Sequence, residues 1–394
     1  MADAEALIAE AQALFKERYG RDAEHAILAP GRVNLIGEHM DYNDGLVLPM
    51  AIDRSIALLA GEREQGPDGM RIFSATLDQE ITVDYAAVDK DAASGWAAYV
   101  IGVIALCQLR GMRPPAMDVV LMSSLPRGAG LSSSAALEVA LATLLETVCR
   151  TSLEPWEKIR LCQQAENDYA GMPCGIMDQA TVVLAQAGHL LLLDCDTLVT
   201  RDVPFDDPSV SVLIIDSRVK HKLIDSPFAE RRQQCEDAAA TLGKPLRALS
   251  MQELDARRGE LEVVNYRRAR HVVTEIVRTA SAVDALADAE WQLAGKLMYD
   301  SHASLRDDYE VSCVEVDALV KICATLGWDA GVYGARITGG GFGGCVVALV
   351  DTMKVDEIKS AVGDTYRAQT GLQARFISTV PAAGARCVDD WQRD

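Results

Sequence analysis

Apolar residues along the first sixty positions predict one helix followed by short strands. Leu7, Ala11 and Leu14 recur at helical intervals within residues 1–20, which predicts an amphipathic N-terminal helix. Between residues 26 and 60, short apolar segments alternate with turns rich in Gly, Asp and Asn, a pattern typical of antiparallel strands. The N-terminal region is therefore expected to hold a sheet preceded by a helix.

The rest of the chain shows strands early and long helices late. Two strand-sized apolar runs flank a turn rich in Pro and Asp within residues 189–216, and a boundary placed there divides the chain into domains 1–205 and 206–394. Because strands precede helices without regular alternation, the pattern predicts an α+β fold rather than a doubly wound one. Helical periodicity covers residues 96–111, 134–150, 229–242, 264–285, 288–303 and 312–325.

The composition indicates a globular protein with a strong acidic excess. The 394 residues include 38 Lys and Arg against 58 Asp and Glu, a formal net charge of −20. Such a charge repels phosphate backbones, so we expect no nucleic-acid partner and a small-molecule ligand instead. Steering of an anionic ligand would then require a locally positive cleft.

The cysteines and histidines indicate whether the protein holds disulfides or zinc, and the apolar runs indicate whether it spans a membrane. Ten cysteines without a C-x-x-C pair and six histidines without H-E-x-x-H indicate neither a disulfide framework nor a zinc site. The acidic N-terminal segment is unlike a signal peptide, and no uncharged apolar run approaches the ~18 residues of a membrane span. We therefore expect a cytoplasmic protein with free thiols and no membrane partner.

A first polar segment, residues 29–53, lies between apolar strands. Its side chains suit hydrogen bonding to a polyhydroxylated ligand, but Asn43, Asp44 and Gly45 are also ordinary turn residues. A ligand site and a solvated hairpin tip both remain open. The polar side chains are Arg32, Asn34, Glu38, His39, Asp41, Tyr42, Asn43 and Asp44.

A second segment, residues 125–149, has the outline of an anion site. Gly128 and Gly130 permit a tight turn with exposed N–H groups, and the helical stretch that follows directs its positive end toward that turn. The alternative is a glycine turn with a serine N-cap. The segment lacks G-x-x-x-x-G-K-[ST], so it is not a Walker A loop. Its hydroxyls belong to Ser132, Ser133 and Ser134.

A third segment, residues 334–350, contains G-x-G-x-x-G at Gly339, Gly341 and Gly344. A strand-like run follows these glycines, whereas a dinucleotide fingerprint would open a helix. A protein kinase would need H-R-D and D-F-G motifs downstream, and neither follows. The glycines therefore predict close backbone approach to a ligand or to another chain segment.

Six stretches of the chain share motifs with one family. A turn at residues 171–173 separates two carboxylates, Glu166 and Asp178, each of which alone could be a helix cap. The motifs are GRVNLIGEHMDY (31–42), WAAYVIGVI (96–104), LPRGAGLSSSA (125–135), GIMDQ (175–179), SHASLRDDYEVS (301–312) and GGGFGG (339–344).

In this order the motifs resemble those of the galactokinases, within the GHMP superfamily of small-molecule kinases. The resemblance spans the whole chain, and its first motif is specific to the galactokinase branch. It implies a two-domain α+β fold, with an N-terminal domain like ribosomal protein S5, a C-terminal ferredoxin-like domain and the active site between them. It also implies ATP and Mg²⁺ as cofactors and phosphorylation of D-galactose at C1. We expect the protein to be a monomer.

The resemblance implies a role for each matching residue. Asp178 would accept the proton of the anomeric hydroxyl, and Arg32 would orient that carboxylate and favour its charged form. Phosphoryl transfer depends mainly on positioning and charge neutralisation, so orientation would matter more than basicity. The implied sugar contacts are Glu38, His39, Asp41, Gly175 and Phe228; the implied nucleotide contacts are Gly128, Gly130, Ser132, Ser133, Ser134, Trp96 and Lys220; the implied Mg²⁺ ligands are Ser134 and Glu166.

Two positions depart from the family pattern. Met40 stands where many galactokinases have Thr, and Phe228 stands where the family usually has a Tyr that contacts the sugar. Loss of that hydroxyl would remove a hydrogen bond worth about 0.5 to 1.5 kcal/mol. A same-fold kinase for N-acetylgalactosamine or galacturonate therefore stays open. A non-catalytic galactose sensor is the other alternative, although sensors lose part of the serine-alanine loop that is intact here.

Overall fold

The computed structural model describes residues 2–88, 94–126, 128–219 and 227–388. Its largest sheet has six strands in the order β13-β1-β3-β6-β4-β5, and all neighbours are antiparallel except the parallel pair β4 and β6. The strands are β1 His25–Asn34, β3 Pro49–Glu62, β4 Gly69–Ser74, β5 Gln79–Asp84, β6 Met117–Ser123 and β13 Arg386–Cys387.

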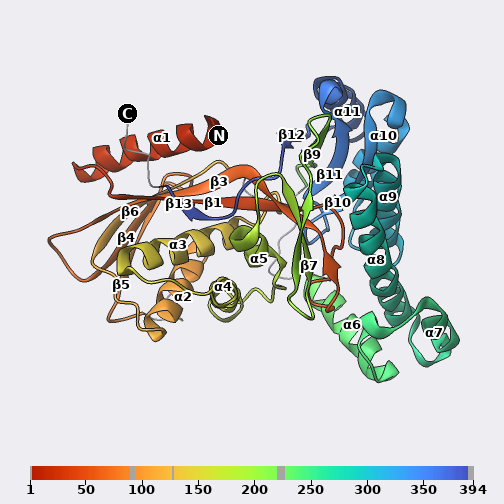
Figure 1. Cartoon of the computed structure of the whole chain (residues 1–394), viewed down its shortest axis with the longest axis horizontal. Coiled ribbons are helices and arrows are strands. Elements are labelled where there is room, and N and C mark those ends of the chain that lie inside the picture. The colour runs from red at the N-terminus through yellow and green to blue at the C-terminus, as the bar shows by residue number, and fades with distance from the viewer. Residues whose placement is uncertain (1, 89–93, 127, 220–226, 389–394) are drawn as a thin grey trace.

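Helices cover both faces of this sheet (Figure 1). Successive side chains of a strand point to opposite faces, so Leu58 of β3 packs in the main core while Leu59 packs under the N-terminal helix. Helix α1 lies alone on that second face, and the four others form the layer that carries the second segment. The helices are α1 Ala2–Tyr19, α2 Trp96–Leu109, α3 Ser133–Cys149, α4 Pro155–Asp168 and α5 Met177–Leu184.

A four-stranded antiparallel sheet, ordered β10-β11-β9-β12, forms the other half of the molecule. Helices α9 and α10 pack on it, and α7 lies at the end of the molecule away from the first sheet (Figure 1). The elements are β9 Val210–Asp216, α6 Pro227–Leu242, α7 Met251–Ala256, α8 Val263–Ala287, α9 Trp291–Asp307, α10 Val314–Leu326, β10 Val332–Thr338, β11 Cys345–Asp351, α11 Val355–Thr370 and β12 Arg375–Thr379.

A small third sheet joins the first polar segment to the strands before the predicted boundary. It is ordered β2-β7-β8, with β2 Leu46–Val47, β7 His189–Asp194 and β8 Thr200–Pro204. The main core cluster includes Val212 of β9 and Val347 of β11 together with residues of the six-stranded sheet. This cluster therefore extends from the first sheet into the second half, whose other sheet face packs into a second core cluster that includes Leu213 of β9 and Val346 of β11.

The predicted helices and the mixed helix and strand content are confirmed within a few residues at each end. The pattern did not indicate the strands β4, β5, β6 and β12 or their pairings. It also did not indicate that β13 pairs with β1 through Ile27 and Cys387. The end of the chain thus returns to the first sheet, although it falls within the predicted domain 206–394. Because β13 has only two residues, it has too few positions to show a hydrophobic period. The domain boundary at residue 205 stays a prediction.

Candidate active site

The centre of the site is an ion pair between Arg32 of β1 and Asp178 in the first turn of α5. Arg32 Nε donates to Asp178 Oδ1 at 2.8 Å, and Nη2 donates to Oδ2 at 2.9 Å. This two-point geometry orients the carboxylate as well as attracting it. Arg32 is only 6% exposed, so solvent screens the pair weakly. The structure thus brings together the two residues predicted to be catalytic, which lie 146 positions apart.

The second segment wraps around this pair. Gly130 has φ +71°, a left-handed conformation that suits glycine, and its carbonyl accepts a hydrogen bond from Arg32 Nη1 at 2.7 Å. Ser132 is also left-handed, and its hydroxyl donates to Asp178 rather than capping α3. The alternative of a serine N-cap is therefore wrong. Ser133 is exposed at the N-terminus of α3, where helix N–H groups favour an anion.

The glycines of the third segment allow close approach of other chain segments. A side chain at Gly341 would meet the carbonyl of Val311, and one at Gly339 would lie 3.3 Å from the carbonyl of Gly130. Cys345 Sγ also lies 3.0 Å from the carbonyl of Ala129. The segment leads into strand β11, as predicted, and it packs against the backbone of the second segment at Ala129 and Gly130.

Glu38 is buried at the junction of the two halves. Its Oε2 atom accepts hydrogen bonds from both terminal nitrogens of Arg336, each at 3.1 Å, and from the amide of Asn34. Its Oε1 atom accepts from the backbone N–H of Gly339. Both oxygens are thus already engaged by protein donors. This pairing ties the first segment to β10, and contact of Glu38 with a sugar remains a prediction.

His39 and Phe228 lie side by side, as their predicted shared site requires. Their ring centroids are 5.5 Å apart, and the Phe228 ring also packs against Tyr42 at 5.1 Å. His39 is 4% exposed, and its Nε2 atom has no hydrogen-bond partner among the described residues. Burial lowers the pKa of His39 well below 6.5, so its imidazole is neutral at pH 7. A buried ring nitrogen without a partner suits a ligand contact.

Asp41 and Gly175 are in direct contact. Gly175 leaves no room for a side chain, because a methyl group there would overlap the carboxylate of Asp41. Desolvation raises the pKa of Asp41 to about 7, and the negative charges of Asp178 and Glu38 add to this effect. Sequence reasoning identified both residues, and the structure shows that they face each other.

We expect Gly175→Ala to raise the KM for the sugar by about tenfold or more, because the new methyl group displaces Asp41. Steady-state kinetics with both substrates varied would measure this. Gly259→Ala is the matched control, since a methyl group at Gly259 would have no neighbouring atom within 4 Å among the described residues. An unchanged sugar KM in Gly175→Ala would show that the position of Asp41 is unimportant.

The raised pKa of Asp41 predicts how stability depends on pH. The unfolded chain ionises this group near pH 4, while the folded protein keeps it protonated up to about pH 7. Stability should therefore fall as pH rises from about 4 to 7, because the unfolded state binds fewer protons in that window. We expect Asp41→Asn, without ligand, to gain a few degrees more in Tm at pH 8 than at pH 5 relative to wild type. The exposed neighbour in Asp44→Asn serves as control, and equal Tm changes at both pH values would contradict the prediction.

The two predicted metal ligands also lie together. A hydrogen bond with the Ser134 side chain favours the charged form of Glu166, but burial and the charge of Asp178 raise the pKa of Glu166 to about 7. Hydroxyl and carboxylate oxygens beside surplus negative charge suit Mg²⁺. No group of three or more His, Cys, Asp or Glu able to hold a metal occurs among the described residues, and Mg²⁺ binding by this pair stays a prediction.

Two buried residues behind this pair were missed as functional candidates. Gln179 Nε2 donates to Glu166 Oε2 at 2.7 Å and to Glu138 Oε2 at 3.0 Å. Glu138 is fully buried in α3, and burial together with Glu166 raises its pKa well above 4.5. A lone glutamate within the apolar run of residues 135–145 is the signal that could have revealed it.

The remaining predicted nucleotide contacts are less completely described. Trp96 is partly buried at the first residue of α2, and its ring N–H donates to Gln79 Oε1 at 3.0 Å. Gly128 has φ +68° at the start of the second segment. Lys220 lies outside the described residues. Adenine contact for Trp96 and phosphate contact for Lys220 therefore stay predictions.

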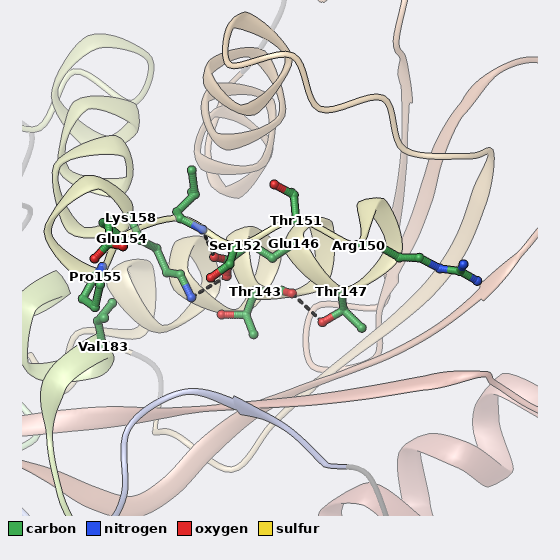
Figure 2. Close-up of a pocket in the computed structure, with 11 residues that line it drawn as sticks. Thr143, Glu146, Thr147, Arg150, Thr151, Ser152, Glu154, Pro155, Lys158 and Val183 are labelled. Carbon is green, nitrogen blue, oxygen red and sulfur yellow. Dashed lines mark hydrogen bonds and ion pairs between the residues drawn. The ribbon is translucent and has the colours of Figure 1, made fainter.

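Two cavities lie near these elements. One of about 580 Å³ lies at the far end of α3, where Lys158 pairs with Glu146, and it contains none of the predicted residues (Figure 2). The other, of about 530 Å³, adjoins the start of the second segment and is lined by three guanidiniums. The three guanidiniums belong to Arg54, Arg218 and Arg375. Carboxylates pair with two of them, Asp53 with Arg54 at 3.1 Å and Asp216 with Arg218 at 3.6 Å.

Comparison with known proteins first defines the class. The GHMP kinase N-terminal domain matches residues 98–186, and the GHMP kinase C-terminal domain matches residues 282–368. A solved mevalonate kinase shares the fold with a TM-score of 0.65 at 18% identity, over 90% of this chain and 98% of that one. The molecule is thus a two-domain α+β GHMP kinase, as predicted.

More specific matches define the branch. The galactokinase galactose-binding signature matches residues 13–62. Human galactokinase is 44% identical over 96% of both chains, and dog galactokinase is equally similar over the same share. A crystal structure of Lactococcus lactis galactokinase complexed with galactose has a TM-score of 0.90 at 32% identity, over 96% of this chain and 99% of that one. The chain belongs to the galactokinase family.

Proposed function

We propose that the protein catalyses ATP-dependent phosphorylation of D-galactose at its C1 hydroxyl, giving galactose 1-phosphate and ADP. One observation carries the proposal: Arg32 holds Asp178 by two hydrogen bonds at the N-terminus of α5, beside the glycine and serine loop that opens α3. Base, orienting cation and anion site thus meet in one place. Membership of the galactokinase family supports galactose as the sugar.

In this proposal Asp178 accepts the proton of the anomeric hydroxyl. Arg32 and the Ser132 hydroxyl hold the carboxylate in one orientation, which reduces the entropy lost on reaching the reactive geometry. The transition state of phosphoryl transfer is loose, so alignment of the attacking oxygen contributes more than the strength of the base. N–H groups at the start of α3 would stabilise the charge on the phosphates.

Sugar recognition would come mainly from the first segment. His39 offers an unpaired Nε2 atom, Asp41 offers a carboxylate, and the backbone of Gly175 lies against Asp41. Glu38 and Phe228 would complete the contacts with the sugar, and the hydrogen bonds of Glu38 to Arg336 would also hold the segment in place. A site with buried polar groups discriminates against an epimer, because the wrong hydroxyl leaves one group unpaired.

The nucleotide would bind along the second segment. Gly128, Gly130 and the three serines at 132–134 would contact its phosphates, with Trp96 near the adenine and Lys220 near the transferred group. The cavity next to Leu125 and Pro126, which is lined by three guanidiniums, would attract MgATP toward this loop despite the acidic net charge.

Ser134 and Glu166 are the residues that would hold Mg²⁺. When bound, the ion neutralises phosphate charge as the phosphoryl group is transferred. Gln179 contributes independently of the metal, because its amide restrains the Glu166 carboxylate through the 2.7 Å hydrogen bond.

We further propose a cytoplasmic monomer. All ten cysteines are free thiols, which supports a reducing compartment. In the part of the chain that the structure describes, none of the helices has the length and apolarity needed to cross a membrane.

ADP release with MgATP tests the function directly. The sugars are galactose, N-acetylgalactosamine, galacturonate and glucose, with mevalonate as a non-sugar control. Turnover on galactose with little on the others is the expected result. Preference for N-acetylgalactosamine or galacturonate would assign a different sugar to the same fold. Binding of galactose and ATP without ADP release would indicate a sensor.

A further inference from the structure

One motif of this sequence has no role in the mechanism above. Residues 301–312 contain Tyr309, whose side chain is fully buried although its hydroxyl is polar. Tyr309 also packs its ring against His39, with centroids 4.9 Å apart. A buried hydroxyl needs partners, so its hydrogen bonds indicate what it does.

The hydroxyl of Tyr309 belongs to a chain of hydrogen bonds that ends at His39. Tyr309 Oη lies 3.0 Å from Tyr42 Oη, which in turn lies 2.8 Å from His39 Nδ1. On its other side, Tyr309 Oη lies 3.2 Å from Cys235 Sγ and 3.5 Å from the side-chain nitrogen of Asn43. The hydrogen bonds therefore connect Cys235 to Tyr309, Tyr309 to Tyr42 and Tyr42 to His39, and Asn43 joins this network at Tyr309.

The donors at the Cys235 end of this network determine which way each hydroxyl donates its proton. Burial raises the pKa of Cys235 to about 11, so its thiol is protonated and can donate. The side-chain nitrogen of Asn43, which also donates to the carbonyl of His39 at 2.7 Å, can only donate. These two donors occupy the lone pairs of the Tyr309 oxygen. Its own proton then has Tyr42 as acceptor. The reverse order would direct that proton to sulfur, a weak acceptor.

This direction of the hydrogen bonds determines the tautomer of His39. If Tyr309 donates to Tyr42, Tyr42 donates to His39 Nδ1, which must be the unprotonated nitrogen of the neutral ring. The remaining proton then lies on Nε2, the buried atom that has no partner among the described residues. The rings of Phe228 and Tyr309 pack against the imidazole, at centroid distances of 5.5 and 4.9 Å, and hold it in place.

We propose that Tyr309 is a positioning residue that, through Tyr42, fixes His39 in the Nε2–H tautomer, so that His39 acts as a hydrogen-bond donor to the sugar. This inference deepens the proposed function and rests on it for the identity of the ligand. The tautomer itself is a property of the ligand-free protein.

Tyr309→Phe tests the proposal with little risk to folding, because it keeps the ring that packs against His39 and removes only the hydroxyl. ¹⁵N NMR of the ligand-free protein, with the His39 signals assigned from a His39→Gln sample, reports which ring nitrogen carries the proton. We expect Nε2–H alone in the wild type and a tautomer mixture in Tyr309→Phe. The KM for galactose should rise severalfold, while kcat and the KM for MgATP stay within about twofold.

Tyr299→Phe is the matched control, because the buried Tyr299 hydroxyl has no partner among the described residues. It should change neither the spectrum nor the KM. Tyr42→Phe should reproduce Tyr309→Phe, and the double variant should be no worse than Tyr42→Phe, since the two act in series. An unaltered tautomer in Tyr309→Phe would overturn the proposal, as would an unaltered galactose KM. If the wild type phosphorylates no sugar, the proposed function fails while the spectrum still decides the tautomer.

Discussion

Replacement of Asp178 by Asn is expected to lower kcat by about 10²- to 10⁴-fold, the usual contribution of a positioned general base. The amide cannot accept the proton of the anomeric hydroxyl. It also cannot receive donors at both terminal atoms, so the two hydrogen bonds from Arg32 are no longer both possible. The KM for MgATP should change little, because the second segment keeps its own backbone. Steady-state ADP release with galactose measures both constants.

Asp288→Asn provides the control, since Asp288 is exposed at the end of α8. Equal melting temperatures of Asp178→Asn and the wild type would exclude misfolding as the cause of lost turnover. A kcat for Asp178→Asn within about threefold of the wild type would rule out Asp178 as the catalytic base.

Replacement of Glu38 by Gln is expected to reduce the free energy of unfolding by about 3 to 5 kcal/mol, the cost of breaking a buried ion pair by removing one partner. Arg336 would be left charged with none of its side chain exposed, and Gln offers one oxygen where the carboxylate offered two. Sugar affinity should fall as well, because the first segment keeps only the hydrogen bonds from Arg336 and Thr338 to the carbonyl of Asn34 as its links to β10. Thermal and chemical denaturation would measure the loss of stability.

Asp300→Asn is the matched control for this experiment. It breaks the exposed pair of Lys296 and Asp300 on α9, which is worth only about 0.3 to 0.5 kcal/mol. The double variant Glu38→Gln with Arg336→Met should be more stable than Glu38→Gln alone, because it removes the unpaired buried charge. Equal stability of Glu38→Gln and Asp300→Asn would contradict a structural role for the buried pair.

The residues of the candidate site could largely be named from the sequence, but several of their interactions could not. The sequence context of Ser132 favours a phosphate contact, with a helix cap as the alternative, and its hydroxyl in fact donates to Asp178. The motif of Glu38 predicts a ligand for sugar hydroxyls, yet both carboxylate oxygens already accept hydrogen bonds from protein donors. Which donor reaches a side chain depends on segments brought near it by folding, and local spacing carries no information on those.

The sequence by itself determined most of the long helices, the early strands, the α+β class and the family. Hydrophobic periodicity is a local property, so it was sufficient for the helices and strands that it named, but it did not indicate α5, α11, β4 or β5. Tertiary structure alone decided the pairing of Glu38 with Arg336, 298 positions away, and the chain from Tyr309 to His39. Such contacts form only when the two halves pack together, because local spacing does not determine which distant segments become neighbours.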